Sequence, residues 1–136
     1  MNLEAFMIEE ENKEIEYVAS KRFIDSDNKP IPWRLRAITA QENQELRKVC
    51  YHNIPTLKKG QYTKDFDTVK YLGLLAERCV VFPNLLDAKL QDFYHVKTAS
   101  ELLGRLLNPG EYDDLTAKLQ EVNGYDLEGE VNEAKN

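Results

Sequence analysis

Residues 67–82 read DTVKYLGLLAERCVVF and carry the strongest helical pattern of the chain. Apolar residues recur there at i, i+3, i+4, i+7 and i+11, the spacing of one helix face. Further apolar residues widen this face, and charged residues keep only a narrow strip. A helix that is apolar nearly all round lies at the centre of a fold, so we expect a central helix ended by Pro83. The face consists of Val69, Leu72, Gly73, Ala76 and Val80.

Three more helices are predicted towards the C-terminus: a short one after Pro83, and two longer ones that each begin with a clear capping signal. Thr98, with a glutamate three residues later, is a capping-box sequence before a leucine-rich segment. Asn108 is a preferred cap, Pro109 suits the first helical position, and Glu111 suits the third. Gly124 is the expected left-handed stop of this last helix.

Before the central helix, the pattern changes from helical spacing to that of a β-hairpin. Residues 17–24 are rich in aromatic and β-branched side chains, and residues 31–38 alternate between apolar and polar ones. Turn-forming residues lie between them, and Asn28 is the one best able to adopt a positive φ. Pro32 confines the second strand to a sheet edge, or leaves its first position unpaired.

A helix and a long connection are expected between this hairpin and the central helix. Thr39 with Glu42 forms a capping box, and apolar residues follow at helical spacing. Pro55 stops any continuation of this helix. Residues 51–64 are polar and predict a connecting loop, of a length that is often functional in a small domain.

Together these elements predict a mainly α (α+β) fold, with an N-terminal β-hairpin followed by a compact bundle of about five short helices and acidic flexible termini. We expect a mobile acidic N-terminal arm at residues 1–14, a single globular domain at residues 15–125 and an acidic disordered tail at residues 126–136. Within the domain, the hairpin covers residues 17–38 and the helices cover about residues 39–124.

The composition of the 136-residue chain is that of a soluble protein, with 42% hydrophobic residues and a net charge of −6. No apolar run reaches the roughly 18–20 residues that span a bilayer. The N-terminus also lacks the basic and apolar pattern of a secretion signal. We therefore expect a cytoplasmic protein without a membrane partner. The acidic balance argues against nucleic acid as a partner.

Residues that could carry chemistry are few. His52 and His95 lack partners at a metal-binding spacing, and Cys50 and Cys79 form neither a disulfide framework nor a zinc knuckle. No glycine-rich phosphate loop is present. We expect no enzyme, no catalytic or metal site and no cofactor.

Partner binding is the better-supported expectation. Basic residues of the predicted hairpin could line an open sheet edge that accepts a partner strand. Alternatively, Trp33 belongs to the core and the arginines form its solvated face. Acidic termini are typical of segments that order on a partner, although they also serve plain solubility. The candidate partner-binding residues are Phe23, Trp33, Arg34, Arg36, Lys58 and Lys59.

Several short motifs occur in a recognisable order. They are SKRF (20–23), PWxxRAI (32–38), DTxKY (67–71), PNL (83–85), DAxLQ (87–91), LLxPGEYxxL (106–115) and QExNGY (120–125). Together they resemble the XkdN-like tail assembly chaperones of tailed bacteriophages and of defective prophages of Gram-positive bacteria. The resemblance covers roughly residues 15–125 and rests on the order of the motifs, since none is specific alone. The chain departs from the family at the turn around Asn28, where a glycine is expected.

This resemblance implies a non-enzymatic function in the bacterial cytoplasm. The protein would bind the tape-measure protein and keep that long, apolar, helical chain soluble until tail-tube subunits polymerise around it. The tail tube protein and a second copy of the chain are further candidate partners. Two alternatives stay open: a structural phage tail or head–tail completion component, and an acidic regulatory module that binds a basic protein.

Overall fold

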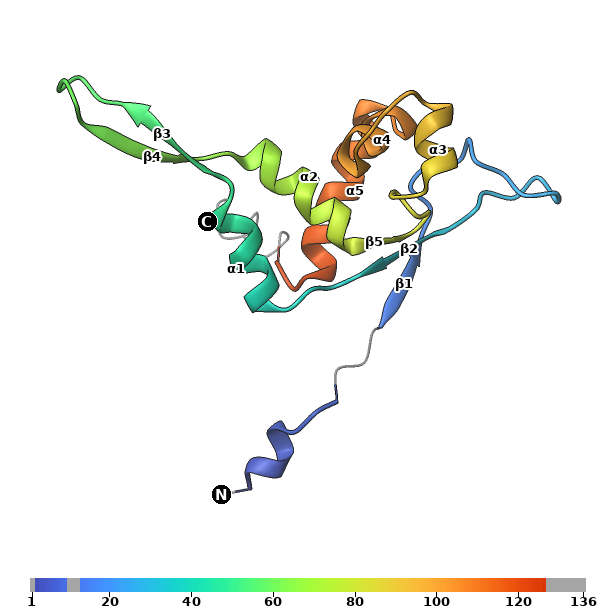
Figure 1. Cartoon of the computed structure of the whole chain (residues 1–136). Coiled ribbons are helices and arrows are strands. Elements are labelled where there is room, and N and C mark those ends of the chain that lie inside the picture. The colour runs from blue at the N-terminus through green and yellow to red at the C-terminus, as the bar shows by residue number, and fades with distance from the viewer. Residues whose placement is uncertain (1, 10–12, 127–136) are drawn as a thin grey trace, which may run out of the picture.

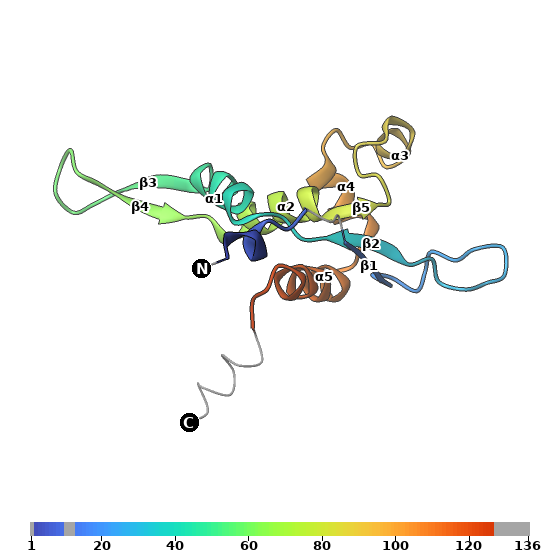
Figure 2. The same ribbon diagram turned by 90° about the horizontal axis from the view of Figure 1, so that it is seen from below.

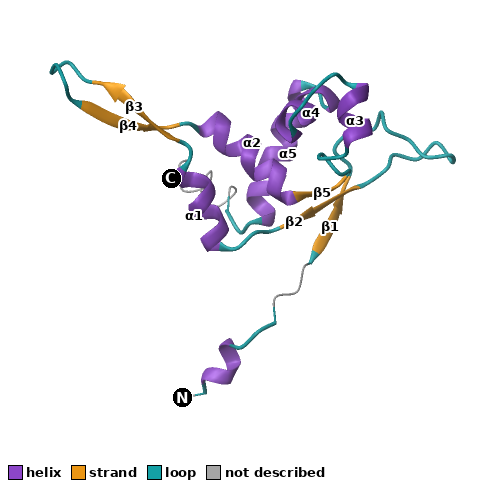
Figure 3. Ribbon diagram, in the orientation of Figure 1, coloured by secondary structure: helices purple, strands orange, loops and turns teal. Residues whose placement is uncertain are grey.

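The computed structural model describes residues 2–9 and 13–126. In these residues a short 3-10 helix is followed by five strands and five α-helices. Figure 1 and Figure 3 show a helical body from which two hairpin-like segments extend at opposite ends. The elements are η1 (Leu3–Phe6), β1 (Glu14–Tyr17), β2 (Trp33–Arg36), α1 (Ala40–Lys48), β3 (Tyr51–Pro55), β4 (Tyr62–Phe66), α2 (Thr68–Cys79), β5 (Val80–Phe82), α3 (Ala88–Phe93), α4 (Ala99–Leu106) and α5 (Pro109–Val122).

Strand β2 lies in the middle of a three-stranded antiparallel sheet with the order β1–β2–β5. The predicted alternation is confirmed here, because Trp33 and Leu35 are buried while Arg34 is exposed. β1 pairs with β2 from Glu14 opposite Arg36 to Tyr17 opposite Trp33. On its other side β2 pairs with β5, with a register irregularity between Arg34 and Leu35.

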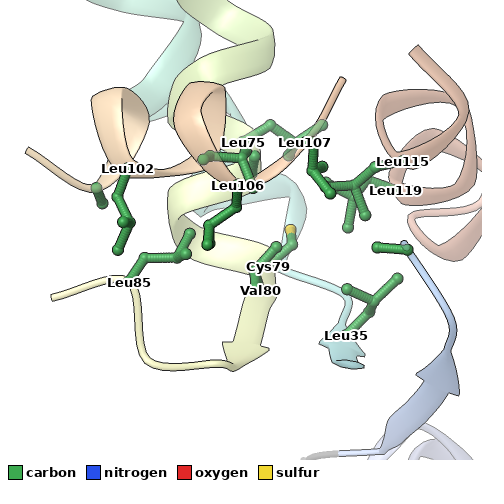
Figure 4. Close-up of a cluster of buried hydrophobic side chains, with 14 of the residues drawn as sticks. Leu35, Leu75, Cys79, Val80, Leu85, Leu102, Leu106, Leu107, Leu115 and Leu119 are labelled. Atoms are coloured by element: carbon green, nitrogen blue, oxygen red, sulfur yellow. The ribbon is translucent and has the colours of Figure 1, made fainter. Parts of the chain in front are cut away.

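Helices α2 and α5 contact this sheet, and the helices form the core with it. Helix α2 contacts α1, α4 and α5, and α5 also contacts β2. Figure 4 shows Leu35 of β2 below side chains from α2, the end of α4 and α5. Leu115 and Leu119, four residues apart on α5, are both 0% exposed, as the predicted apolar seam requires. The largest fully buried side chains are Trp33, Leu35, Leu75, Leu102, Leu103, Leu115, Leu119, Cys50 and Cys79.

Local capping begins each of the described α-helices, as the sequence predicts for three of them. In α5 the Asn108 side chain accepts from the backbone N–H of Glu111, and the Glu111 carboxylate accepts from the N–H of Asn108, a complete capping box. Gly124 ends this helix with a φ of 93°, and Asn28 has a φ of 60° in its turn, as expected. The capping residues are Thr39 for α1, Asp67 for α2, Asp87 for α3, Thr98 for α4 and Asn108 for α5.

The expectation of a mainly α protein is wrong, because the fold is α+β. Of the described residues, 43% are helical and 19% lie in strands. The polar segment predicted as a loop instead forms the β3–β4 hairpin, in which all five residues of β3 face a residue of β4. The end of the predicted central helix is strand β5, because Val80 and Phe82 pair with β2.

The predicted N-terminal hairpin is present, but its strands differ from the expected ones. The first strand is Glu14–Tyr17, and not residues 17–24. Residues 18–32 form a long connection that extends from the body (Figure 1). Pro32 precedes a central strand and not an edge strand, which is possible because it stands just before the first paired residue.

Other expectations are corrected by exposure or lie outside the described residues. Val69 is 81% exposed and does not belong to the buried face of α2. It stands in the first turn of that helix, where none of the described elements covers it. The division into arm, single domain and tail stays a prediction. Residues 10–12 of the arm and residues 127–136 of the tail lie outside the described residues.

We expect Leu35→Ala to lower the free energy of unfolding by about 2–5 kcal/mol, because it leaves a cavity under the helices. Denaturant unfolding followed by the fluorescence of Trp33, the one tryptophan of the chain, measures this loss. Leu57→Ala is the matched control, since Leu57 is fully exposed at the tip of the β3–β4 hairpin. Equal effects of the two substitutions would contradict the central place of Leu35 in the core.

Candidate partner-binding surfaces

An apolar cleft of about 210 Å³ opens where the sheet meets α3 and the end of α4. Its walls come from segments far apart in the sequence, brought together by the pairing of β2 with β5. Small-molecule sites typically measure about 300–1,000 Å³ and hold a few placed polar groups. This cleft is smaller and almost wholly apolar, so it suits apolar side chains of a protein partner. Its lining residues are Phe23, Ile31, Trp33, Phe82, Pro83, Leu90, Tyr94 and Leu106.

Arg22 holds the wall of the cleft that carries Phe23. Its guanidinium donates to the carbonyl oxygen of Leu106 at 2.8 Å and to the Glu111 carboxylate at 2.7 Å. The guanidinium also lies over the Phe23 ring, 5.3 Å from its centroid. The connection between β1 and β2 is therefore tied to the end of α4 and the start of α5.

The hydrogen bonds of this contact change the pKa of Glu111. The backbone N–H of Asn108, the Ser20 hydroxyl and the Arg22 guanidinium all donate to the carboxylate, and together they lower the pKa of Glu111 to about 2. Hydrogen bonds to the charged form of a carboxyl group favour that form. The carboxylate thus caps α5 and anchors the cleft wall at the same time.

Trp33 lies at the floor of the cleft and is only 2% exposed. The structure therefore agrees with the alternative in which Trp33 belongs to the core. Phe23 is half-buried and lines the same cleft, so the structure brings these two predicted residues together. Whether either one contacts a partner stays a prediction.

The two arginines of β2 have different surroundings. Arg34 lies over the ring of Phe82, 5.3 Å from its centroid, and its guanidinium is 3.4 Å from the Glu14 carboxylate. Because Phe82 lines the cleft and is 40% exposed, Arg34 adds a positive charge at the rim. Arg36 donates through Nε to the carbonyl oxygen of Arg78 at 3.0 Å and does not line the cleft.

Lys58 and Lys59 lie away from this cleft, in the exposed turn of the β3–β4 hairpin (Figure 2). The base of the hairpin is fixed by aromatic packing. Phe66 lies 5.1 Å from Tyr51 between ring centroids, and the Arg47 guanidinium lies 4.5 Å above the Phe66 ring. The candidate residues therefore divide between two separate surfaces.

Sequence reasoning missed the later half of the cleft. Phe82, Leu90 and Tyr94 carry no local signal of a binding surface, because each stands in an ordinary apolar pattern. The pairing of Arg34 with Phe82 places the latter beside β2. A strand assignment for residues 80–82, from their β-branched content, would have been the one signal available.

Among the described residues, no three His, Cys, Asp or Glu side chains lie close enough together to hold a metal ion. Within residues 2–9 and 13–126, no helix has the length and apolar character needed to cross a membrane. Burial raises the pKa of both the Cys50 and the Cys79 thiol, which keeps them in the unreactive protonated form.

Comparison with known proteins gives a family and a structural relative. The model of the family described as phage XkdN-like tail assembly chaperone protein matches residues 3–135. Two proteins of Bacillus subtilis (strain 168), YqbN and the phage-like element PBSX protein XkdN, are each 33% identical over 132 residues, which is 93% of this chain and 86% of the relative. A crystal structure of the protein YqbN matches with a TM-score of 0.73 and 26% identity, covering 90% of this chain and 96% of that one. The resemblance predicted from the motifs is confirmed.

We expect Trp33→Ala to lower the free energy of unfolding by about 3–5 kcal/mol, because it empties the floor of the cleft. Thermal melting followed by circular dichroism measures this loss, and Trp33→Phe, which keeps an aromatic ring, should retain most of the stability. An unchanged melting temperature together with lost partner binding would make Trp33 an interface residue instead.

Glu111 predicts a specific acid sensitivity. Its pKa is lower in the folded protein, about 2, than its ordinary value of 4.5. Its contribution is therefore complete above pH 4.5 and disappears as the pH falls towards 2. Between pH 4.5 and 2, the free energy of unfolding of Glu111→Gln should fall less than that of the wild-type protein. Denaturant unfolding at several pH values measures this difference. Identical pH profiles for the two proteins would contradict the assignment.

Proposed function

The chain belongs to the phage XkdN-like tail assembly chaperone family, and on this premise we propose that it binds the tape-measure protein of its phage or prophage and keeps it soluble during tail assembly. Tail assembly chaperones are not an enzyme class, and their role implies contact with phage tail proteins. We further propose that this chain acts without catalysis, in the cytoplasm of the bacterial host. The apolar cleft below α3 is the observation that supports binding of an apolar client.

The cleft matches the chemistry of an amphipathic helical client. Such a helix presents apolar side chains at intervals of three and four residues, and a groove-binding partner receives them in apolar pockets. Phe82 and Tyr94 offer aromatic surface at the cleft, where a client side chain can leave water. The Arg34 guanidinium lies 3.4 Å from the Glu14 carboxylate, but its side chain is half exposed, so it can also pair with an acidic residue on the polar face of the same helix.

This surface is separable from the folded core. Phe82 is 40% exposed and stands at the end of β5, so its side chain contributes contact area without filling the centre of the protein. Trp33 below it is buried. Substitution at the rim therefore tests binding, whereas substitution at the floor tests stability.

Phe82→Asp should weaken binding of the tape-measure protein by about tenfold or more, because it places a charge where an apolar side chain must dock. Co-expression with the tape-measure protein, followed by pull-down and by measurement of its soluble fraction, checks this. Val69→Asp is the matched control, since Val69 is an exposed apolar residue on α2 outside the cleft. Melting temperatures of both variants establish that they are folded.

Four outcomes would contradict the proposal. The tape-measure protein could stay insoluble in the presence of the wild-type chain, or it could be soluble without it. Equal binding by Phe82→Asp and the control would remove the cleft from the mechanism. Finally, mass spectrometry of purified particles should not find the chain, because its presence there would favour a structural tail component.

A further inference from the structure

The N-terminal arm presents a cluster of large apolar side chains to water. Leu3, Phe6, Met7 and Ile8 are 63%, 78%, 76% and 81% exposed. The short helix η1 carries Leu3 and Phe6, and Met7 and Ile8 follow it directly. The Asn2 side chain caps η1 by accepting from the N–H of Glu4 at 3.0 Å. Exposed apolar groups that lie together mark an interaction site more often than scattered ones do.

The arm is also acidic. Residues 2–9 contain two glutamates and no basic residue, a net charge of −2. Glu4 lies within the apolar cluster, and Glu9 directly follows it. A surface that covers this arm must therefore offer apolar contact and positive charge together.

The β3–β4 hairpin has both properties. Tyr51 and Phe66, and also Pro55 and Tyr62, face each other across the two strands and so share one face of the ribbon. Tyr51 is 45% exposed and Tyr62 is 64% exposed. A ribbon of two strands is marginal in water without a covering partner, so this hairpin gains stability from a contact on its aromatic face.

The charge of the hairpin is opposite to that of the arm. Residues 51–66 contain three lysines and one aspartate, a net charge of +2 with the histidine neutral. Lys64 stands on the aromatic face, opposite Asn53. Lys58 and Lys59 lie in the turn, next to the fully exposed Leu57.

The arm and the hairpin leave the body in different directions, as Figure 1 shows. We propose that the arm of one copy, residues 2–9, binds the aromatic and basic face of the β3–β4 hairpin of a second copy. Two copies related by a twofold axis make this contact twice, which doubles the buried area of a single arm. Self-association through this contact is independent of client binding in the cleft.

Charge favours the acidic arm over other partners for the β3–β4 hairpin. Two hairpins paired edge to edge would bring like charges together, which is unfavourable. Nucleic acid would meet a chain whose net charge is −6, with only three lysines on the hairpin. The arm is both acidic and apolar, so it complements both the lysines and the aromatic residues of the hairpin.

Light scattering across a range of concentrations tests the proposal on the full chain without client. The wild-type chain should dimerise, and Phe6→Glu should weaken the dimer by about tenfold or more. The triple substitution Lys58→Glu, Lys59→Glu and Lys64→Glu should do the same. Its control is Lys29→Glu, Lys89→Glu and Lys97→Glu, three exposed lysines elsewhere, which should leave the dimer within about threefold of wild type because the total charge changes equally.

Mixing the two defective variants separates this contact from general destabilisation. The Phe6→Glu chain keeps an intact hairpin, and the lysine-substituted chain keeps an intact arm. Together they should form a mixed dimer through one intact contact, weaker than the wild-type dimer but tighter than the dimer of either variant alone. A wild-type chain that stays monomeric at every concentration, including one whose arm folds onto its own hairpin, would overturn the proposal. A dimer that neither variant weakens, or variants that fail to complement each other, would overturn it as well.

Discussion

The burial of Trp33 and Leu35 on the middle strand of a small sheet is the constraint on which the other elements depend. These two residues point to the same side of β2, because side chains alternate along a strand. A shift of one residue in either pairing would bring Arg34 into the core instead. The register therefore sets the positions of β1 and β5 together. It also sets where α2 ends, since α2 leads directly into β5.

Helix α5 joins this sheet to the segments on either side of it. At its start, Glu111 holds Arg22 of the connection between β1 and β2. At its end, the Asn123 side chain accepts from the backbone N–H of Ile38 at 2.9 Å and donates to the carbonyl oxygen of Leu119 at 2.7 Å. Polar side chains thus fix both ends of the helix, while its leucines supply the apolar burial. Arg22 thus joins the wall of the cleft to this helix.

The molecule separates stability from the surfaces proposed for binding. Its buried leucines form one cluster between sheet and helices, whereas the arm, the β3–β4 hairpin and the cleft rim keep large apolar side chains in water. Such exposure costs solubility unless a partner covers it. A chaperone needs surfaces of this kind, because its partner must be bound by contact area and charge and not by chemistry at a catalytic group.

Features that depend on neighbours in the chain could be predicted from the sequence. The caps at Thr39 and Asn108 and the stop at Gly124 each need only residues within one helical turn. The alternation around Trp33 was equally local. The motifs also identified the family, because the order of motifs along a chain needs no coordinates.

Features that depend on distant partners could not be read in this way. Residues 80–82 have apolar spacing that fits a helix, and only the adjacent strand β2 makes them a strand. Residues 51–66 lack an apolar alternation, and their pairing with each other supplies the structure that the pattern does not signal. The cleft was out of reach for the same reason, since Phe23, Phe82 and Leu90 meet only after the sheet has formed. Local hydrogen bonds and side-chain spacing depend only on neighbouring residues, so the sequence determines them directly. Strand pairing and concave surfaces depend on contacts between distant segments, which meet only when the chain folds.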